Sequence, residues 1–497
     1  MKTNFMVYIA GDNNLDDAAT NDILEIKSVK YTGEDLNILI QRDYREESKN
    51  SKRFVIKNGS VTHELELGET DTGESQTLTE FLNWGLKSYK AQRNILVIWN
   101  HGGGTLDESI PLEDGTVLSP RRGNLFSKTT HLKRLEVLKI TEDEDRRKAI
   151  ANDDAAGNYL DNIEIKDVFE NIDNSIAKKF DIIGFDACLM SMIEVQYQLK
   201  SYTKIIVGSE ELEPNNGWDY ARIVSYLVKN PNATNEEVVN EIITSYFDFY
   251  HLIREELTLA SIYTDKLEET ICLMDFLAHT LLRKKENIRH EIWSLFENIQ
   301  IFKYENWYKD LYHFVLKIEE IFSSDNDIVK ACNELKNNLD NEVILINRTE
   351  SPRLKNAYGI SCYLPTEDDR SFLALEIFSL LDINQVDGAP NWFKFFKQIA
   401  TIDSFPSDVY NTLPRKPCKI SNSYIKKGDS GEVVFKIQKD LNMLNILDEE
   451  LVVDGIFGTQ TEKAVVYFQK KYNLMVDGII GNQTLEKIKE LILLLQR

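Results

Sequence analysis

Short apolar runs alternate with amphipathic stretches over the first 225 residues of the chain. The apolar runs are bounded by turn-forming or polar residues, as buried strands are. They predict strands at Asn4–Ala10, Leu36–Gln41, Arg53–Lys57, Asn94–Asn100, Phe180–Asp186 and Lys204–Gly208. Between them, apolar positions recur with a period of about 3.6 residues, which predicts helices at Leu15–Val29, Thr77–Tyr89, Asn162–Asn171 and Met190–Leu199.

Two of these strands, with the sequences ILVIW and DIIGF, are apolar on both faces. Strands of this kind are typical of a parallel sheet that helices cover on each side. The alternation therefore predicts an α/β fold, layered as an α/β/α sandwich. Residues 226–340 are predicted to be mostly helical, with a strand at Thr258–Thr264, and Asn356–Leu364 is a further strand expected to complete the sheet late.

A change in composition marks a domain boundary near residue 404. The segment 404–423 collects Pro406, Pro414, Pro417 and several Ser and Asn residues, and it lacks hydrophobic periodicity. Such a segment is typical of a linker. We therefore predict a first domain at residues 1–403 and a second at residues 424–497.

The second domain contains an internal repeat. Val453–Thr461 (VDGIFGTQT) recurs as Val476–Thr484 (VDGIIGNQT), displaced by 23 residues. Each copy reads as a Gly-rich turn with a Thr placed to cap the helix that follows. Two copies predict one small helical domain with pseudo-symmetry rather than a solenoid.

The charge balance narrows the classes of partner. With 58 Lys and Arg against 81 Asp and Glu, the formal net charge is −23. A chain this acidic is unsuited to sequence-blind binding of nucleic acid, which needs clustered basic residues, so we expect no nucleic-acid partner. The hydrophobic share of 42% is enough for a large packed core, which excludes wholesale disorder.

No membrane or export signal is evident in the sequence. No uninterrupted apolar stretch approaches the ~18–20 residues needed to span a bilayer, and the segment MKTNFMVYIAGDNN lacks the cleavage site of a secretory signal. We therefore expect cytoplasmic synthesis, and the final location, including later association with the cell wall or release, stays open. The five cysteines are far apart and odd in number, which predicts neither a disulfide framework nor a zinc site.

Two predicted strands lead directly into reactive residues. Asn94–Asn100 is followed by His101 and three glycines, and Phe180–Asp186 by Ala187 and Cys188. Ligands of open α/β sheets bind beyond the carboxyl ends of the strands, so a His and a Cys 87 positions apart can meet there. A thiolate is the working nucleophile and needs a base or a positive environment. Cys188 also opens the predicted helix at Met190–Leu199, whose dipole favours negative charge.

The glycines after His101 allow backbone amides to approach a developing oxyanion closely. A structural reading stays open on spacing alone, because free Cys is among the most buried residue types and a lone His after a strand is usually structural.

The sequence resembles the clostripain family of cysteine peptidases, relatives of the caspases, gingipains and legumains. The matching segments are VYIAGDNNLDDAATNDILEI, ILVIWNHGGG, NDDAAGNYLDNIEI, DIIGFDACLMSMIEV, VGSEELEPNNGWDY, TLASIYTDKL and YGISCYLP, in the order of the family. The resemblance implies a caspase-like α/β/α sandwich with a mostly parallel sheet and a helical extension. It also implies a cysteine endopeptidase that cleaves proteins or peptides after Arg or Lys.

The resemblance assigns roles to individual residues. The dyad His falls on His101 and the nucleophile on Cys188, and the amides of Gly102 and Cys188 are expected to hold the oxyanion. The acid that binds a basic P1 side chain falls on Asp186, for which the alternative is a strand-end residue that caps local amides. Glu210, Glu213 and Asp219 follow in a matched loop, where they either shape the same P1 pocket or are ordinary surface carboxylates.

Residues 119–149 depart from the family pattern, as a basic surface insertion in an acidic chain. Family members are often cut between the His and Cys segments after a basic residue, and Arg147 and Lys148 are the first candidates, with Arg121-Arg122 and Lys133-Arg134 as alternatives. The other reading is a solvated linker. No cofactor is expected to be required; calcium dependence is a trait of some members, and Asp153, Asp154 and Asp161 offer oxygen ligands without the spacing of an EF-hand.

Residues 424–488, with KKGDSGEVVFKIQKDLNML and both copies of the repeat, resemble the small all-α peptidoglycan-binding domain. The resemblance implies binding of the cell wall, or only packing against the host enzyme. Two other functions stay open: a non-catalytic wall-binding scaffold with a peptidase-like body, and an enzyme that acts on wall peptides.

Overall fold

The computed structural model describes most of the chain. The described residues are 1–45, 50–104, 150–153, 158–173, 176, 179–253, 255–284, 289–296, 298–302, 305–364, 381–384, 386–387, 392, 394–395, 416–417, 425–428, 432–447, 450–472, 474, 476, 478–480 and 482–495. They fall into two compact units: Met1–Leu267 with Phe296–Phe314 and Leu339–Ile383, and Glu268–Leu295 with Val315–Asn338 and Asn384–Arg497.

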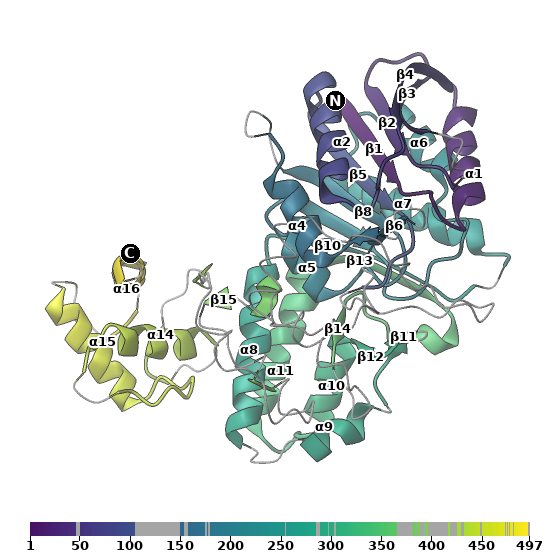
Figure 1. Cartoon of the computed structure of the whole chain (residues 1–497). Coiled ribbons are helices and arrows are strands. Elements are labelled where there is room, and N and C mark those ends of the chain that lie inside the picture. The colour runs from purple at the N-terminus through teal and green to yellow at the C-terminus, as the bar shows by residue number, and fades with distance from the viewer. Residues whose placement is uncertain are drawn as a thin grey trace, which may run out of the picture. The chain divides into compact units, whose positions relative to one another are not determined.

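The first unit is built on a sheet of nine described strands in the order β13-β10-β9-β8-β5-β1-β2-β3-β4 (Figure 1). The strands are β1 (Thr3–Ile9), β2 (Leu36–Arg42), β3 (Ser51–Lys57), β4 (Ser60–Gly68), β5 (Arg93–Trp99), β8 (Phe180–Asp186), β9 (Thr203–Gly208), β10 (Leu257–Tyr263) and β13 (Ile344–Glu350). The five central strands are parallel, and the pairs β2–β3, β3–β4, β9–β10 and β10–β13 are antiparallel. The predicted mostly parallel sheet is confirmed.

Helices cover both faces of this sheet, because alternate side chains of the strands are apolar in both directions. On one face, alternate residues such as Phe5 and Val7 share a core with α1 (Asp16–Ser28), α6 (Tyr220–Lys229) and α7 (Asn235–Tyr250). The other face carries α2 (Ser75–Ser88), α4 (Asn162–Glu170) and α5 (Ile193–Leu199) (Figure 1). Tyr8 packs there against Phe81 of α2, with ring centroids 5.9 Å apart.

The edges of the sheet differ from the prediction. Residues 356–364 were expected to complete the sheet, but β14 (Ser361–Tyr363) pairs with β12 (Glu305–Asp310), which also pairs with β11 (Ile301–Phe302). The last strand of the main sheet is β13, and β4 at the opposite edge was not predicted either. Strand β4 is largely exposed and β13 only half-buried, so neither carries the apolar run that marks a central strand.

The smaller elements complete the described chain. The strand pairs are β6 (Ile150–Asp153) with β7 (Asn158–Leu160) and β15 (Val386–Asp387) with β16 (Lys416–Pro417). The remaining helices are α8 (Leu267–Lys284), α9 (Arg289–Phe296), α10 (Leu311–Ile321), α11 (Asn326–Asn338), α14 (Glu432–Met443), α15 (Thr459–Lys471) and α16 (Asn482–Leu495), with π- and 3-10 turns η1 (Leu339–Val343), η2 (Pro352–Leu354) and η3 (Asp382–Asn384). The predicted helical character of residues 226–340 is confirmed.

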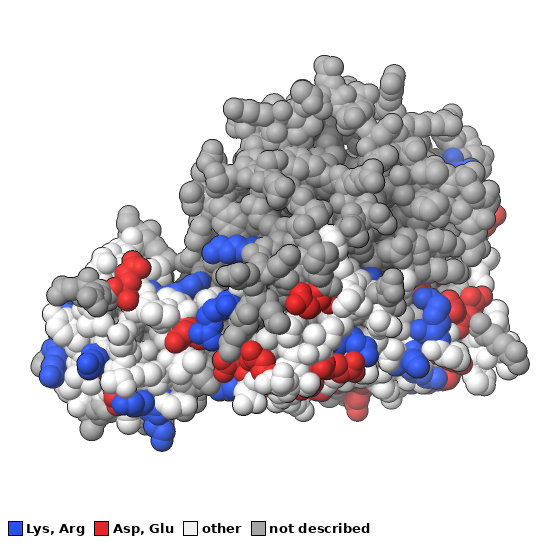
Figure 2. All heavy atoms as spheres, turned by 90° about the horizontal axis from the view of Figure 1, so that it is seen from below, with Lys and Arg blue, Asp and Glu red and all other residues white. Residues whose placement is uncertain are grey.

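The second unit joins α11 and most of α8, α9 and α10 to residues 384–497. The division into domains at residues 1–403 and 424–497 stays a prediction. Cys188, Cys332 and Cys362 are free thiols, and Cys272 is disulfide-bonded, which the sequence did not predict. Figure 2 shows basic and acidic side chains interspersed on the face that it presents. Among the described helices, none is both long enough and apolar enough to cross a bilayer.

Within residues 425–495, α14, α15 and α16 enclose one apolar core, and the two repeats are held in the same way. Gln438 of α14 accepts a hydrogen bond from the Gly455 amide and donates to the Thr461 hydroxyl. Gln469 of α15 accepts in turn from the Gly478 amide. In each repeat, the Thr hydroxyl therefore accepts a hydrogen bond from a glutamine of the preceding helix.

The expected capping role of these threonines is wrong for the first copy. Helix α15 begins at Thr459 with Gly458 as its N-cap, and no side chain caps it. The described pseudo-symmetry rests on a buried glutamine in the helix that precedes each repeat turn.

Candidate active site

His101 and Cys188 lie beyond the ends of two adjacent parallel strands. Strands β5 and β8 pair in register, with Trp99 opposite Asp186, and the amide of Asn100 donates to the Asp186 carbonyl at 3.3 Å. Each of the two residues follows two positions beyond that pair. The structure therefore places both residues beyond the carboxyl ends of the parallel strands, as we expected from the sequence.

Gly102 fits tightly against the segment that carries Cys188. A Cβ atom at Gly102 would lie 2.1 Å from the Cys188 carbonyl oxygen, so any larger residue would displace the main chain. Gly102 also forms an antiparallel bridge with Ile150, the first residue described after residue 104. The glycine after His101 is therefore required by a close approach of two backbones, and its role with Cys188 as an oxyanion donor stays a prediction.

The His101 imidazole is oriented by a residue of the turn after β1. Its Nε2 lies 2.7 Å from Oδ1 of Asn14, and His101 is half-buried. Asn100 anchors the same segment, since its side chain donates to the Ala10 carbonyl at 2.5 Å. We did not single out Asn14 from the sequence, although the turn at residues 11–14 follows a strand that ends at this edge.

The Cys188 sulfur is in contact with the backbone of Glu213. The Glu213 amide donates to Sγ at 3.2 Å, and Sγ lies 3.8 Å from the Glu213 carbonyl oxygen. Cys188 is partly exposed as a residue, but burial raises the pKa of its thiol to about 12. In this arrangement the thiol is protonated near neutral pH and needs a base to become a nucleophile.

The prediction that a helix dipole favours negative charge at Cys188 is wrong. Helix α5 begins at Ile193 rather than at Met190, and Cys188 lies in the turn before it. Leu189 in that turn has a φ of +61°, a conformation that a branched side chain adopts only under local constraint. The turn, and not a helix terminus, presents the sulfur.

Asp186 is buried beneath this turn, on the face of the sheet that α1, α6 and α7 cover. The Tyr220 hydroxyl donates to its Oδ2 at 2.8 Å and the Trp218 amide at 3.3 Å. A Cβ atom at Gly184 would lie 2.6 Å from the Trp218 ring, so the glycine in DIIGF makes room for that indole. Burial raises the pKa of Asp186 to about 6.

Glu213 is the second carboxyl group of this cluster. The Trp218 indole Nε1 donates to Glu213 Oε2 at 3.1 Å, while Oε1 is buried without a donor among the described residues. Its carboxyl group interacts directly with that of Asp186, and burial followed by this neighbour raises the pKa of Glu213 well above its usual value. Two carboxyl groups in contact each disfavour the ionisation of the other.

The other two candidate residues of the P1 pocket make structural contacts. Glu210 Oε2 accepts from the Gly359 amide at 2.8 Å, and its carboxyl group interacts with Asp310. Asp219 caps α6 by accepting from the Arg222 amide at 2.8 Å. A role in substrate binding stays a prediction for both.

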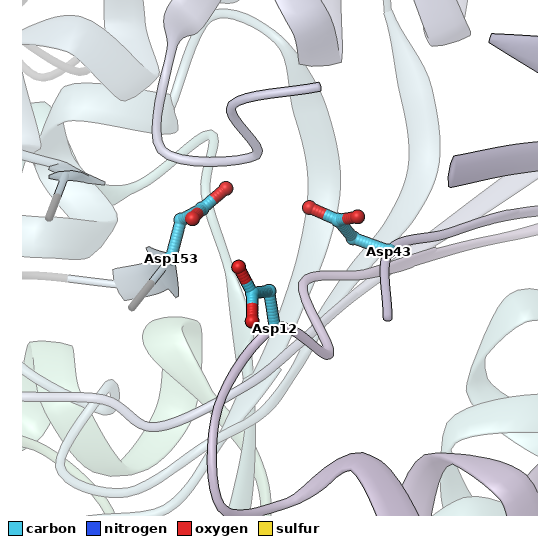
Figure 3. Close-up of side chains that lie close together, drawn as sticks. All are labelled: Asp12, Asp43 and Asp153. Atoms are coloured by element: carbon cyan, nitrogen blue, oxygen red, sulfur yellow. The ribbon is translucent and has the colours of Figure 1, made fainter. Parts of the chain in front are cut away.

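A separate set of three carboxylates is suited to a hard cation. Asp12 follows β1, Asp43 follows β2 and Asp153 ends β6, and the three point toward one another (Figure 3). All three are buried, with ligand oxygens within 4.8 Å of one another. Burial and Asp153 contribute to raising the pKa of Asp43 to about 8, so the group is poorly stabilised as an anion. Of the oxygen ligands suggested by the sequence, Asp161 caps α4 and Asp154 lies outside the described residues.

The family model of clostripain peptidases (C11) matches residues 7–117 and 138–410. The chain belongs to the clostripain family. The unmatched residues 118–137 overlap the predicted insertion at residues 119–149, and Arg147 and Lys148 of that insertion are outside the described residues. Residues 430–488 match the model of a putative peptidoglycan binding domain.

Relatives of the clostripain family agree with this assignment. Clostripain of Hathewaya histolytica is 24% identical over 266 residues, which span 48% of this chain and 44% of that protein, so less than half of the relative is matched. A secreted C11 cysteine protease from Bacteroides thetaiotaomicron, solved with an irreversible peptide inhibitor, is 18% identical. It has a TM-score of 0.53 and covers 77% of this chain and 98% of its own.

An inactive zymogen C11 protease from Parabacteroides distasonis is 19% identical, with a TM-score of 0.53 and coverage of 79% and 97%. These two structures confirm the predicted fold class of the first unit.

Proposed function

We propose that this protein is a cysteine endopeptidase that cleaves after Arg or Lys, with Cys188 as nucleophile and His101 as general base and acid. One observation carries the proposal. Adjacent parallel strands deliver an oriented imidazole, a thiol and a buried carboxylate to the same edge of the sheet. Membership of the clostripain family supports the reaction class.

The reaction begins with transfer of the Cys188 thiol proton to the imidazole of His101. The sulfur attacks the scissile carbonyl, and the amides of Gly102 and Cys188 stabilise the oxyanion that forms. His101 then returns its proton to the leaving amine, which leaves an acyl-enzyme. A water molecule, deprotonated by His101, releases the new carboxyl group and restores the thiol.

The specificity follows from the charge of the buried cluster. Asp186 and Glu213 lie beneath the turn that presents the sulfur, and their described partners are hydroxyl, amide and indole donors rather than Lys or Arg. A guanidinium or ammonium group would neutralise this cluster, whereas an uncharged side chain would leave a buried charge unpaired.

A pair of assays tests this proposal. Fluorogenic peptides that end in Arg, Lys, Leu or Glu are offered to wild type, Cys188→Ala and His101→Ala, with products read by mass spectrometry. We expect cleavage after Arg and Lys, lost at least about 10³-fold in both variants. Cleavage that survives in Cys188→Ala, or no cleavage of any peptide, would contradict the proposal and favour a non-catalytic scaffold; release of stem peptides from purified peptidoglycan would indicate an enzyme of the wall.

Self-processing in the 121–148 insertion extends the same chemistry. The insertion offers Arg147 and Lys148 ahead of Ile150, which bridges to Gly102 next to the dyad. Intact-mass analysis should show a cut in wild type that is absent from Cys188→Ala. A cut in both proteins, or in neither, contradicts self-processing.

The C-terminal domain would hold the enzyme on peptidoglycan, as the match of residues 430–488 supports. The full chain is expected to sediment with purified sacculi, and a chain ending at residue 423 is not.

A calcium ion would find its ligands at Asp12, Asp43 and Asp153. It would tie β6, which follows the insertion, to the ends of β1 and β2.

A further inference from the structure

Glu213 contacts both the nucleophile and the acid assigned to substrate recognition. Its amide donates to the Cys188 sulfur, and its carboxyl group interacts with Asp186. The same loop also closes over Asp186, because a Cβ atom at Gly217, four residues after Glu213, would lie 2.7 Å from Oδ2 of that carboxylate. One short loop therefore covers the acid and supports the sulfur.

The donors around the two carboxyl groups are too few for two buried anions. Asp186 Oδ2 accepts from the Tyr220 hydroxyl and the Trp218 amide, and Glu213 Oε2 accepts from the Trp218 indole. The Ala187 amide also favours the anion of Glu213, but Glu213 Oε1 has no well-aligned hydrogen bond among the described residues. Two unprotonated carboxylates in contact would repel each other, so one proton between them is the arrangement that satisfies both.

A second, independent observation points to a polar occupant. The hydroxyl of Tyr246, in α7, is fully buried and has no hydrogen-bond partner in the part of the chain that the structure describes. Glu213, Asp186 and Cys188 are all within its electrostatic reach. A buried hydroxyl without a partner is costly, and a ligand or water would satisfy it.

We propose that Glu213 is a specificity-determining residue whose carboxyl group shares one proton with Asp186 in the free enzyme and releases it when a basic side chain binds. The inference rests on the proposed function. The reaction balances as a pair of charge −1 that binds a cation, becomes a pair of charge −2, and gives one proton to solvent. The substrate cation takes the place that the proton held between the two carboxylates.

Other titratable groups face Asp186 and Glu213, and each of them is an alternative source of the proton released on binding. Helix α1 contributes Asp22 and Glu25, α6 contributes Tyr220, and α7 contributes Tyr246 and Tyr250. Cys188 and Glu211 lie on the side of the nucleophile.

Asp22 is the competing source. It accepts from the Trp99 indole at 2.8 Å, and burial raises its pKa to about 9, with Asp186 as the next cause. The experiment therefore has to separate Glu213 from Asp22.

The test measures binding without turnover, so a change in the position of the sulfur does not affect it. Cys188→Ala protein is titrated calorimetrically with a tetrapeptide amide that ends in Arg, in two buffers of different ionisation enthalpy, from pH 5.5 to 8.5. We expect release of close to one proton near pH 6.5, with an affinity that rises up to about tenfold per pH unit over the titration of the pair.

The same titration in Cys188→Ala with Glu213→Gln should release no proton and show a flat pH profile, with affinity about tenfold lower at pH 8. Asp22→Asn should leave the released proton in place, and Asp310→Asn, in another carboxyl pair, is the matched control with an unchanged profile. A proton that survives in Glu213→Gln, or disappears in Asp22→Asn, overturns the inference.

The outcome also separates this inference from the proposed function. Binding of the Arg peptide without release of a proton overturns the role of Glu213 alone. Failure of the Arg peptide to bind, together with no cleavage by wild type, overturns the specificity for basic residues and the inference with it.

Discussion

The loop after β9 contributes one acid to each of two buried carboxyl pairs, Glu210 to the first and Glu213 to the second. The two pairs differ in the groups that surround them. In the first pair, Glu210 meets Asp310, and the donors are main-chain amides. Gly359 donates to Glu210 at 2.8 Å, and Tyr358 and His313 each donate to Asp310 at 2.6 Å. Amides in two chain segments fix this pair, so it ties the residues after β9 to the end of β12 and to the segment before β14.

In the second pair, Asp186 meets Glu213, and side chains join main-chain amides as donors. The side-chain donors are the Tyr220 hydroxyl and the Trp218 indole, and the amides are those of Trp218 and Ala187. The backbone of Glu213 holds the Cys188 sulfur. We call the first pair the structural pair because it joins separate chain segments, whereas the second pair lies next to the nucleophile.

The largest expected effect is a loss of activity when one acid of the second pair is replaced; the same replacement in the structural pair serves for comparison. Asp186→Asn removes the carboxylate assigned to the basic side chain, and breaking such a buried ion pair costs about 3–4 kcal/mol. We expect kcat/KM for Arg and Lys peptides to fall about 10²–10³-fold. Steady-state kinetics with these peptides measures the loss.

Asp310→Asn is the matched change in the structural pair. It should lower the midpoint of thermal unfolding and leave kcat/KM within about threefold, since Asp310 contacts the backbone of the β14 region and not the site. Equal losses of activity in both variants would show that the two pairs do not differ in function.

The second prediction concerns how pH changes the stability of the structural pair. Burial raises the pKa of Asp310 to about 7 and that of Glu210 well above its usual value, so the folded chain binds more protons than the unfolded chain. The stability from this pair is fully present below the unfolded pKa of about 4 and is lost as pH rises toward about 7.

Glu210→Gln tests the sign. A carboxamide keeps a donor toward Asp310 and removes the like charge, so the variant should gain stability relative to wild type as pH rises from 5 to 8. The slope difference is up to about 1.4 kcal/mol per pH unit. Urea unfolding at several pH values measures it, and parallel curves for the two proteins would contradict the shared proton.

The sequence predicted the strands that carry the site better than it predicted the partners of the carboxyl groups. The central strands follow from apolar runs, which are a local signal, and His101 and Cys188 both follow directly on such strands, at the carboxyl ends of a parallel sheet. The partners of the carboxyl groups were not predictable, because Glu210 and Glu213 look alike in sequence. Which of them reaches Asp186 depends on the course of the loop and on the room that Gly184 leaves for Trp218. Asn14 and the edge strand β4 were missed for the same reason, since each is defined by a tertiary neighbour.

The smallest expected effect comes from the third carboxylate set, which contrasts with both pairs because it joins three acids. Asp43 accepts hydrogen bonds from the Ser51 hydroxyl and the Tyr44 amide, and Asp153 accepts one from the Thr72 amide. A divalent cation among the three acids would replace the proton that burial favours on Asp43. Calcium at about ten times its dissociation constant would add ~1.4 kcal/mol, or roughly 2–4 °C in the unfolding midpoint. Calorimetry with calcium or EDTA measures this shift, and Asp43→Asn should abolish it. Magnesium is the control, since its demand for tight octahedral geometry disfavours a site fixed by three separate strand ends. An equal shift in Asp43→Asn would place the calcium elsewhere, and no shift in wild type would leave the three acids held by protons, as the two pairs are.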